Sequence, residues 1–207
     1  QFGQSPRSFR AWAGEFELLA AINAGMYATD LSTSIGYLKS GDHYNNPVIN
    51  RGYKSIFACQ PGDSRTDPVR LIDLTCEEYE SFGKQYTSFL QSIRMISCEQ
   101  ENVWEPQDEK WNVAALGTDF SGHLLLIYST TLFSVHDLTN QLLALPISIK
   151  NAMYLEGGFP AGLYLSSEYT SRIFGNLGKP YSFNNDDSQD SRTIPNIIGI
   201  KRRPSNQ

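Results

Sequence analysis

The side chains with the clearest chemical potential lie around one carboxylate, that of Glu156. This residue ends a short apolar run, Ala152 to Leu155, and two glycines, Gly157 and Gly158, follow it directly. Glycines let the backbone turn tightly and let a ligand approach the main chain closely. An acid at the end of a buried strand, followed by such a turn, presents one charged group to a cleft. The alternative is an ordinary hairpin turn with a solvated Glu156.

Polar side chains elsewhere could complete a site of this kind. Arg94 interrupts an apolar run, where an unpaired guanidinium is costly to bury, so it is the candidate catalytic cation beside Glu156. Asn23 and Gln91 could hydrogen-bond a sugar or a phosphate. The alternatives are an exposed edge position for Arg94 and capping of strand-end backbone groups by the two amides. The remaining candidates for substrate binding contribute a hydroxyl or bare backbone: Gly25, Ser92, Gly117, Gly157 and Gly158.

Strand alternation constrains Arg94. In a regular strand Gln91, Ile93 and Met95 share one face, whereas Ser92 and Arg94 lie on the other. Arg94 can therefore share a site with Gln91 only where the strand is bulged or twisted. We hypothesise that it does, and that its charge serves a substrate phosphate.

Other chemistries find no support in the residue spacing. His43, His123 and His136 follow neither a catalytic-triad nor a metal-binding pattern. Asp119 lies in a predicted hairpin turn and is expected to be structural. Neither a phosphate-binding glycine loop nor a dinucleotide fingerprint is present, so we expect no cofactor and no metal.

Composition narrows the class of protein. The chain has 207 residues, a net charge of −5 and a pI near 5.2, which argue against nucleic acid as a partner. The longest purely apolar run, Leu124 to Tyr128, is far too short to span a membrane. None of the three cysteines forms a CxxC pair, which argues against a zinc site. We expect one disulfide, between Cys76 and Cys98, because both lie in polar, loop-like surroundings, with Cys59 free; the alternative is three buried thiols, as in a cytosolic protein.

The hydrophobic pattern predicts an α+β fold. It indicates a single domain with a large mixed, strongly twisted β-sheet and few helices over residues 14–201, between an N-terminal arm at 1–13 and a C-terminal tail at 202–207. Ser134 can cap a helix whose apolar face carries Val135, Leu138, Leu142 and Leu145. That helix is long enough to join two parallel strands. Strands are predicted at 15–23, 34–39, 53–60, 69–74, 89–96, 113–117, 123–129, 152–155, 162–165 and 196–201, the runs at 152–155 and 162–165 pairing as a hairpin.

The order of several short motifs resembles the phosphodiester glycosidase family. The strand end Ile22-Asn-Ala-Gly-Met-Tyr27 is similar to the family's Asn-Ala/Gly-Gly segment, and Ala115-Leu-Gly-Thr-Asp119 is similar to its Ala-Ile-Gly-x-Asp hairpin. Each motif is short, but the ordered set covers most of residues 15–201. The other matching segments are Ile35-Gly36, Leu90 to Ile96, Asn151 to Gly158 and Asn196 to Lys201.

This chain also departs from the family pattern. The family usually carries an arginine just before the Ala-Ile-Gly strand, where Asn112 or Val113 stands here. Its Gly-Pro after Gln-Ser is replaced by Ile93-Arg94, and its aspartate before Gly-Gly is Glu156. The serines that follow those glycines are replaced by Phe159, Pro160 and Ala161.

The resemblance implies a hydrolase that cleaves a sugar-phosphodiester (glycosyl-1-phosphate) linkage in a glycan or glycolipid. Such chemistry passes through an oxocarbenium-like state, which needs a carboxylate. The phosphate leaving group needs cations and N–H donors more than it needs an acid. The alternative is a non-catalytic domain that binds a glycan or a phosphate on the same fold. On either interpretation we expect a carbohydrate or sugar-phosphate ligand and a bacterial protein that is secreted or periplasmic.

Overall fold

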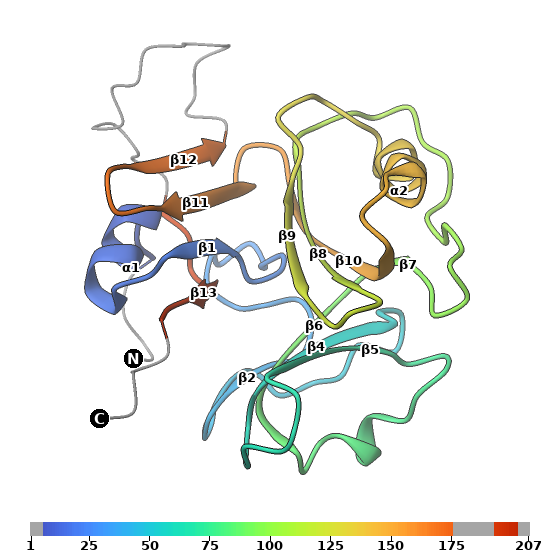
Figure 1. The fold of residues 1–207 in the computed structure, drawn as a ribbon, viewed down its shortest axis with the longest axis horizontal. Coiled ribbons are helices and arrows are strands. Elements are labelled where there is room, and N and C mark those ends of the chain that lie inside the picture. Colours follow the sequence, from blue (N-terminus) through green and yellow to red (C-terminus); the bar gives the residue numbers. More distant parts are fainter. Residues whose placement is uncertain (1–5, 176–192, 203–207) are drawn as a thin grey trace.

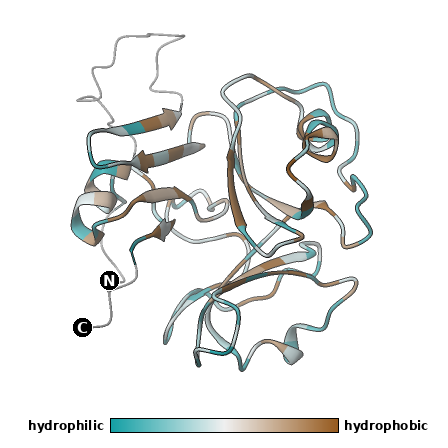
Figure 2. Cartoon of the chain, viewed as in Figure 1, coloured by the Kyte–Doolittle hydropathy of each residue, from teal (hydrophilic) through white to brown (hydrophobic). Residues whose placement is uncertain are grey.

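Three antiparallel β-sheets, with two α-helices packed on them, make up the described chain (Figure 1). The structure, a computed structural model, describes residues 6–175 and 193–202. Hydrophobic residues gather on the strands, whereas the connecting loops are mostly hydrophilic (Figure 2). Within the described ranges, no helix has the length and apolar character that crossing a membrane requires.

The first sheet has the strand order β12-β11-β1-β13, and the helix α1 (Phe9–Phe16) packs beside it. The Ser8 hydroxyl accepts a hydrogen bond from the backbone N–H of Ala11 and caps α1. Phe9 is completely buried, which anchors the helix on the sheet. The strands are β1 (Ala20–Asn23), β11 (Gly162–Ser166), β12 (Ser171–Gly175) and β13 (Ile197–Ile200).

The second sheet, β7-β10-β8-β9, has a different cover on each face. The helix α2 (Val135–Ala144) packs on one face, and the other face meets strands of the other two sheets (Figure 1). Both β9 and β10 pair antiparallel with β8, so these two strands run parallel with β8 between them, as predicted for the crossover. The strands are β7 (Arg94–Ile96), β8 (Val113–Asp119), β9 (Leu124–Tyr128) and β10 (Ile149–Gly157).

The third sheet has the order β3-β2-β6-β4-β5. Its strand β6 leads almost directly into β7 of the second sheet, with only Ile93 between them. The strands are β2 (Leu38–Ser40), β3 (His43–Asn46), β4 (Ser55–Pro61), β5 (Val69–Asp73) and β6 (Tyr86–Ser92), and a short 3-10 turn, η1, spans Tyr79–Ser81.

Several predictions about the fold need correction. The strands divide among three antiparallel sheets instead of forming one large mixed sheet, because the pairing partners switch along the chain. The predicted hairpin at 152–165 does not form, since β10 pairs with β7 and β8, whereas β11 pairs with β1 and β12. The segment predicted as a polar arm contains the start of α1. Residues 1–5 and 203–207 of the predicted arm and tail lie outside the described residues.

The predicted helix after β9 is confirmed. The Ser134 hydroxyl accepts a hydrogen bond from the backbone N–H of Asp137 at 3.0 Å, and Val135, Leu138 and Leu142 are buried. Leu145, predicted on the same face, is 49% exposed, because the helix ends at Ala144 and the chain turns away.

Replacing Leu138 with alanine should lower the free energy of unfolding by about 2–5 kcal/mol. The side chain is 7% exposed in the cluster between α2 and the second sheet, so its removal leaves a cavity. Leu145→Ala is the matched control and should change stability by about 0.5 kcal/mol or less. Equal effects of the two substitutions in chemical denaturation would contradict this assignment of the helix face.

Candidate functional site

A β-bulge aims the Glu156 side chain. Tyr154 pairs with Ala115 and Glu156 pairs with Ala114, so Leu155 is an extra residue on β10. Residues directly opposite each other in a ladder share a face. Glu156 therefore lies on the face of Ala114, which packs toward the first and third sheets, whereas Tyr154 faces α2. Without the bulge, Glu156 would share the face of Tyr154.

The Glu156 carboxylate lies in a partly buried setting that disfavours its charge. Burial raises the pKa of Glu156 from 4.5 to about 7, and the hydrogen bond that its Oε1 accepts from the Gly157 N–H, at 2.9 Å, opposes the rise. The pKa of Tyr27 is also raised, by burial first and then by the charge of Glu156, and the same two causes raise the pKa of Tyr154. An acid that titrates near neutral pH is suited to proton transfer or to charge stabilisation.

The glycines after Glu156 take the chain from the second sheet to the first. Gly158 has a φ of +70°, a conformation that glycine adopts without strain, and its N–H donates to the Asn112 carbonyl at 2.8 Å. Phe159, the next residue, is 54% exposed, and Ala161 is fully buried. The turn therefore carries the chain between the two sheets and leaves Glu156 where they meet.

Asn23 holds the far side of this turn. Its Nδ2 donates to the Pro160 carbonyl at 2.9 Å, and its Oδ1 accepts from the Gly162 N–H at 2.8 Å. Both ends of this buried amide are thus bound to the segment that follows Glu156. Asn23 therefore lies near the turn that follows Glu156, as predicted, but its hydrogen bonds stabilise the backbone of that turn.

The Gln91 side chain is also hydrogen-bonded to backbone groups, which lie just before β2 and in the loop before β4. Its Nε2 donates to the carbonyls of Asn50 and Tyr53, and its Oε1 accepts from the N–H groups of Asn50 and Tyr37. These bonds fix the loop before β4, in the third sheet. The neighbouring Ser92 hydroxyl is buried without a hydrogen-bond partner in the part of the chain that the structure describes.

Arg94, the predicted cation of the site, forms an ion pair with Asp73. Its Nη1 lies 2.7 Å from each carboxylate oxygen of Asp73 and also donates to the Thr75 hydroxyl. Burial works to raise the pKa of Asp73, but hydrogen bonds from Arg94, Thr75 and the Cys98 N–H outweigh it and lower that pKa. The guanidinium is thus engaged with Asp73 at the end of β5, and this ion pair gives no support to the hypothesis that Arg94 supplies the positive charge of the site.

The predicted disulfide lies beside this ion pair. Cys76 and Cys98 are joined, and Cys59 is a free, partly buried thiol, as expected. The Cys98 N–H donates to Asp73 at 3.0 Å, so the disulfide, the carboxylate and the guanidinium form one connected cluster. This cluster ties β5 to the end of β7.

The two remaining predicted glycines lie in different parts of the fold. Gly25, with a φ of +78°, follows β1 two residues before Tyr27, and an added Cβ would approach the Leu90 side chain at 3.0 Å. Gly117 pairs with Ala152 and stands three residues beyond Ala114 on β8, about 10 Å at the usual rise per residue. Gly117 therefore belongs to the middle of the sheet.

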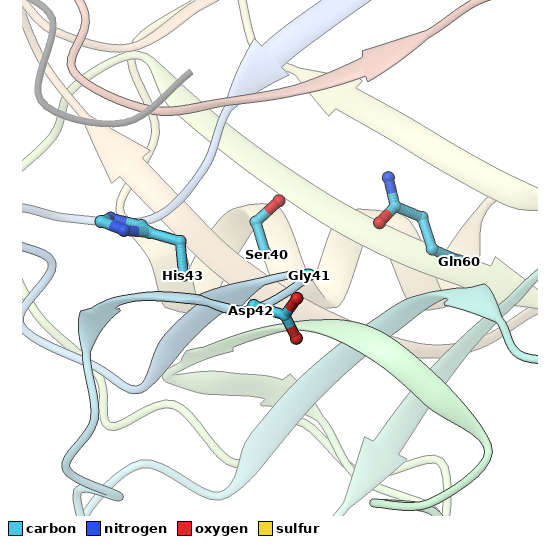
Figure 3. A pocket seen from close by; sticks show the side chains of 5 residues that line it. All are labelled: Ser40, Gly41, Asp42, His43 and Gln60. Carbon is cyan, nitrogen blue, oxygen red and sulfur yellow. The ribbon is translucent and has the colours of Figure 1, made fainter.

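Two surface cavities lie apart from the predicted residues. One, of about 550 Å³, is lined by Ser40, Gly41, Asp42, His43 and Gln60 at the turn between β2 and β3 (Figure 3). The other, of about 600 Å³, runs from Trp12 and Phe16 to Asn45 and Lys201. Ala24 lines this second cavity next to Asn23, but Glu156 lines neither one.

Three aromatic residues around Glu156 were missed in the sequence. Tyr27 and Tyr154 lie within electrostatic range of the carboxylate, and Trp111 contacts the following glycine. Tyr27 ends the Asn-Ala-Gly-Met-Tyr motif, and Tyr154 lies two residues before Glu156. These positions could have indicated both tyrosines, whereas nothing in the local sequence points to Trp111.

The comparisons with known proteins agree with this arrangement of segments. The sequence profile described as "Phosphodiester glycosidase" matches residues 16–201. A search of curated proteins finds no match. Among solved structures, the chain is similar to the catalytic domain of zebrafish N-acetylglucosamine-1-phosphodiester alpha-N-acetylglucosaminidase, auto-inhibited by its pro-peptide. The TM-score is 0.63 and the identity is 15%, over 96% of this chain and 68% of that one.

A hypothetical protein from Synechocystis is also similar, with a TM-score of 0.48 and 11% identity over 78% of this chain and 50% of that one. The zebrafish likeness shows a shared fold. The profile match extends from the end of α1 to the end of β13 and includes Glu156 with its two glycines. On that match, the chain belongs to the phosphodiester glycosidase family.

Proposed function

We propose that this protein hydrolyses a sugar-phosphodiester linkage in a glycan or glycolipid, with Glu156 as the catalytic carboxylate. The observation that carries the proposal is the bulge that turns Glu156 into a partly buried setting, where its pKa rises to about 7. Family membership supports the reaction class. The name of the zebrafish relative describes a sugar-phosphodiester substrate, which agrees with this proposal.

The chemistry assigns Glu156 a role in its ionised form. Departure of a phosphate leaves positive charge on the sugar carbon, and a carboxylate stabilises that charge or activates a water molecule. A phosphate needs little protonation to leave, so a general acid adds little. We therefore expect the ionised carboxylate to be the active species, and its low-polarity surroundings strengthen its interaction with developing charge.

A non-catalytic glycan-binding domain is the second candidate, and one observation favours it. Arg94 is bound to Asp73, and the usual family arginine position is occupied by Asn112 or Val113. The Asn112 amide donates to the carbonyls of Ser129 and Thr130, so it is committed to the backbone. A domain that had lost its phosphate-binding cation would still keep the fold.

A panel of sugar-1-phosphodiesters tests the two candidates. We expect the wild-type protein to hydrolyse at least one member, and Glu156→Gln to lower kcat by about 100-fold or more. Glu168→Gln, an exposed glutamate after β11, is the matched control and should keep wild-type activity. Binding without turnover by both wild type and Glu156→Gln would establish the binding domain instead.

The disulfide supports a further part of the proposal, the compartment. Disulfides persist in oxidising environments, so we propose that the protein is secreted or periplasmic.

A further inference from the structure

Gly157 has no room for a side chain. A Cβ added to it would lie 2.2 Å from Trp111 Nε1, 2.2 Å from the Tyr154 hydroxyl and 2.4 Å from Trp111 Cδ1. Its φ is not in the left-handed region, so packing alone requires glycine here. Gly158 shows the opposite case, with a φ of +70° and open space around the added atom.

The main chain of Trp111 and the ring of Tyr154 are held by neighbouring residues. Trp111 exchanges two backbone hydrogen bonds with Phe133, both at 3.0 Å, and the Tyr154 ring packs on Trp104 with centroids 5.3 Å apart. Gly157 pairs with Val113, which belongs to the cluster that contains Tyr154. Trp111 and Tyr154 therefore pack closely against Gly157, on the face of β10 opposite to the Glu156 side chain.

Gly157 in turn holds Glu156, since its N–H donates to the Glu156 Oε1 at 2.9 Å. We infer that Trp111 and Tyr154 are positioning residues, which fix the bare backbone of Gly157 and through it the orientation of the Glu156 carboxylate. This inference rests on the proposed function only where it concerns turnover. Tyr154 also lies within electrostatic range of Glu156, so a variant of Gly157 itself is needed to isolate the packing effect.

The test follows the carboxyl signal of Glu156 by 13C NMR as the pH is varied, in protein with labelled glutamate. In Gly157→Ala, the displaced turn should expose Glu156 and lower its pKa by about one unit or more. On a hydrolysed substrate, kcat should fall about tenfold or more with little change in KM. Gly14→Ala, at an exposed glycine of α1 with open space around it and no left-handed φ, should change neither quantity.

Removing the obstruction should rescue the alanine. In a Trp111→Leu/Tyr154→Phe background, Gly157→Ala should lower kcat by less than about threefold, because the clash has gone. A pKa of Glu156 and a kcat that stay at wild-type values in Gly157→Ala would overturn the inference. If no substrate is hydrolysed, the proposed function fails, but the NMR titration still decides the positioning role.

Tyr154→Phe is a more conservative variant, which keeps the test usable if Gly157→Ala does not fold. It removes only the hydroxyl and should shift the pKa of Glu156 by about half a unit. Tyr86→Phe, a buried tyrosine in the third sheet, should leave that pKa unchanged. Identical titrations of Glu156 in wild type and Tyr154→Phe would overturn the role of Tyr154.

Discussion

Replacing Arg94 with methionine is expected to lower the free energy of unfolding by about 3–5 kcal/mol at pH 7. The substitution leaves the Asp73 carboxylate, whose side chain is 3% exposed, without its cation. The hydrogen bonds from Thr75 and the Cys98 N–H remain, but they do not neutralise the charge. Denaturant unfolding at a fixed pH measures the loss.

Two comparisons make this expectation specific. Arg70 pairs with Glu77 at a more exposed position, so Arg70→Met should cost about 1 kcal/mol or less. Adding Asp73→Asn to Arg94→Met should recover part of the loss, because the unpaired charge is then removed. Arg94→Met with wild-type stability would mean that the ion pair contributes nothing.

Repeating the unfolding experiment at acid pH tests the same ion pair in a second way. Asp73 has a lowered pKa in the folded protein, so its contribution is present above the ordinary aspartate pKa and is lost as the pH falls. The difference between wild type and Arg94→Met should therefore shrink toward acid pH. A pH-independent difference would assign the loss to packing alone.

Replacing Glu156 with glutamine is expected to stabilise the protein at pH 8 by about 1–3 kcal/mol and to leave stability unchanged at pH 4. The pKa of Glu156 rises from 4.5 in the unfolded chain to about 7 in the fold. Below pH 4.5 the carboxyl is protonated in both states and has no effect. Between pH 4.5 and 7 the unfolded chain ionises first, so wild type loses stability as the pH rises.

Glutamine cannot ionise, so the variant escapes this loss. Glu168→Gln, at an exposed position, should show no such pH dependence. Thermal or denaturant unfolding of the three proteins from pH 4 to pH 8 measures the effect. A Glu156→Gln variant that is less stable than wild type at pH 8 would show that the carboxylate is held by favourable contacts.

Some local elements were readable from the sequence, whereas α1, β3, β12 and the assembly of the strands were not. The capped helix α2 and the β8–β9 hairpin with Gly122 follow from short-range patterns. The division into three sheets depends on which distant strands pair. β11 pairs with β1, about 140 residues earlier, instead of with its neighbour β10. Local alternation is compatible with both arrangements.

The candidate site shows the same limit, because residues with a local signal could be predicted and contacts between distant segments could not. Glu156 stands out because an acid follows an apolar run and precedes two glycines. The partner of Arg94 could not be identified, because Asp73 is 21 residues away and on another sheet. The two glycines after Glu156 look alike in sequence, yet Gly158 is required by its backbone angle and Gly157 by Trp111 and Tyr154.

The pH dependence of kcat/KM for the best substrate in the sugar-1-phosphodiester panel tests the central claim most directly. If ionised Glu156 performs the chemistry, kcat/KM should rise with pH and level off above about pH 7, the pKa of its carboxyl. Glu156→Gln should be slow at every pH. A kcat/KM that falls as the pH rises through 7, or that does not vary between pH 5 and 9, would contradict the assignment of Glu156 as the ionised catalytic carboxylate.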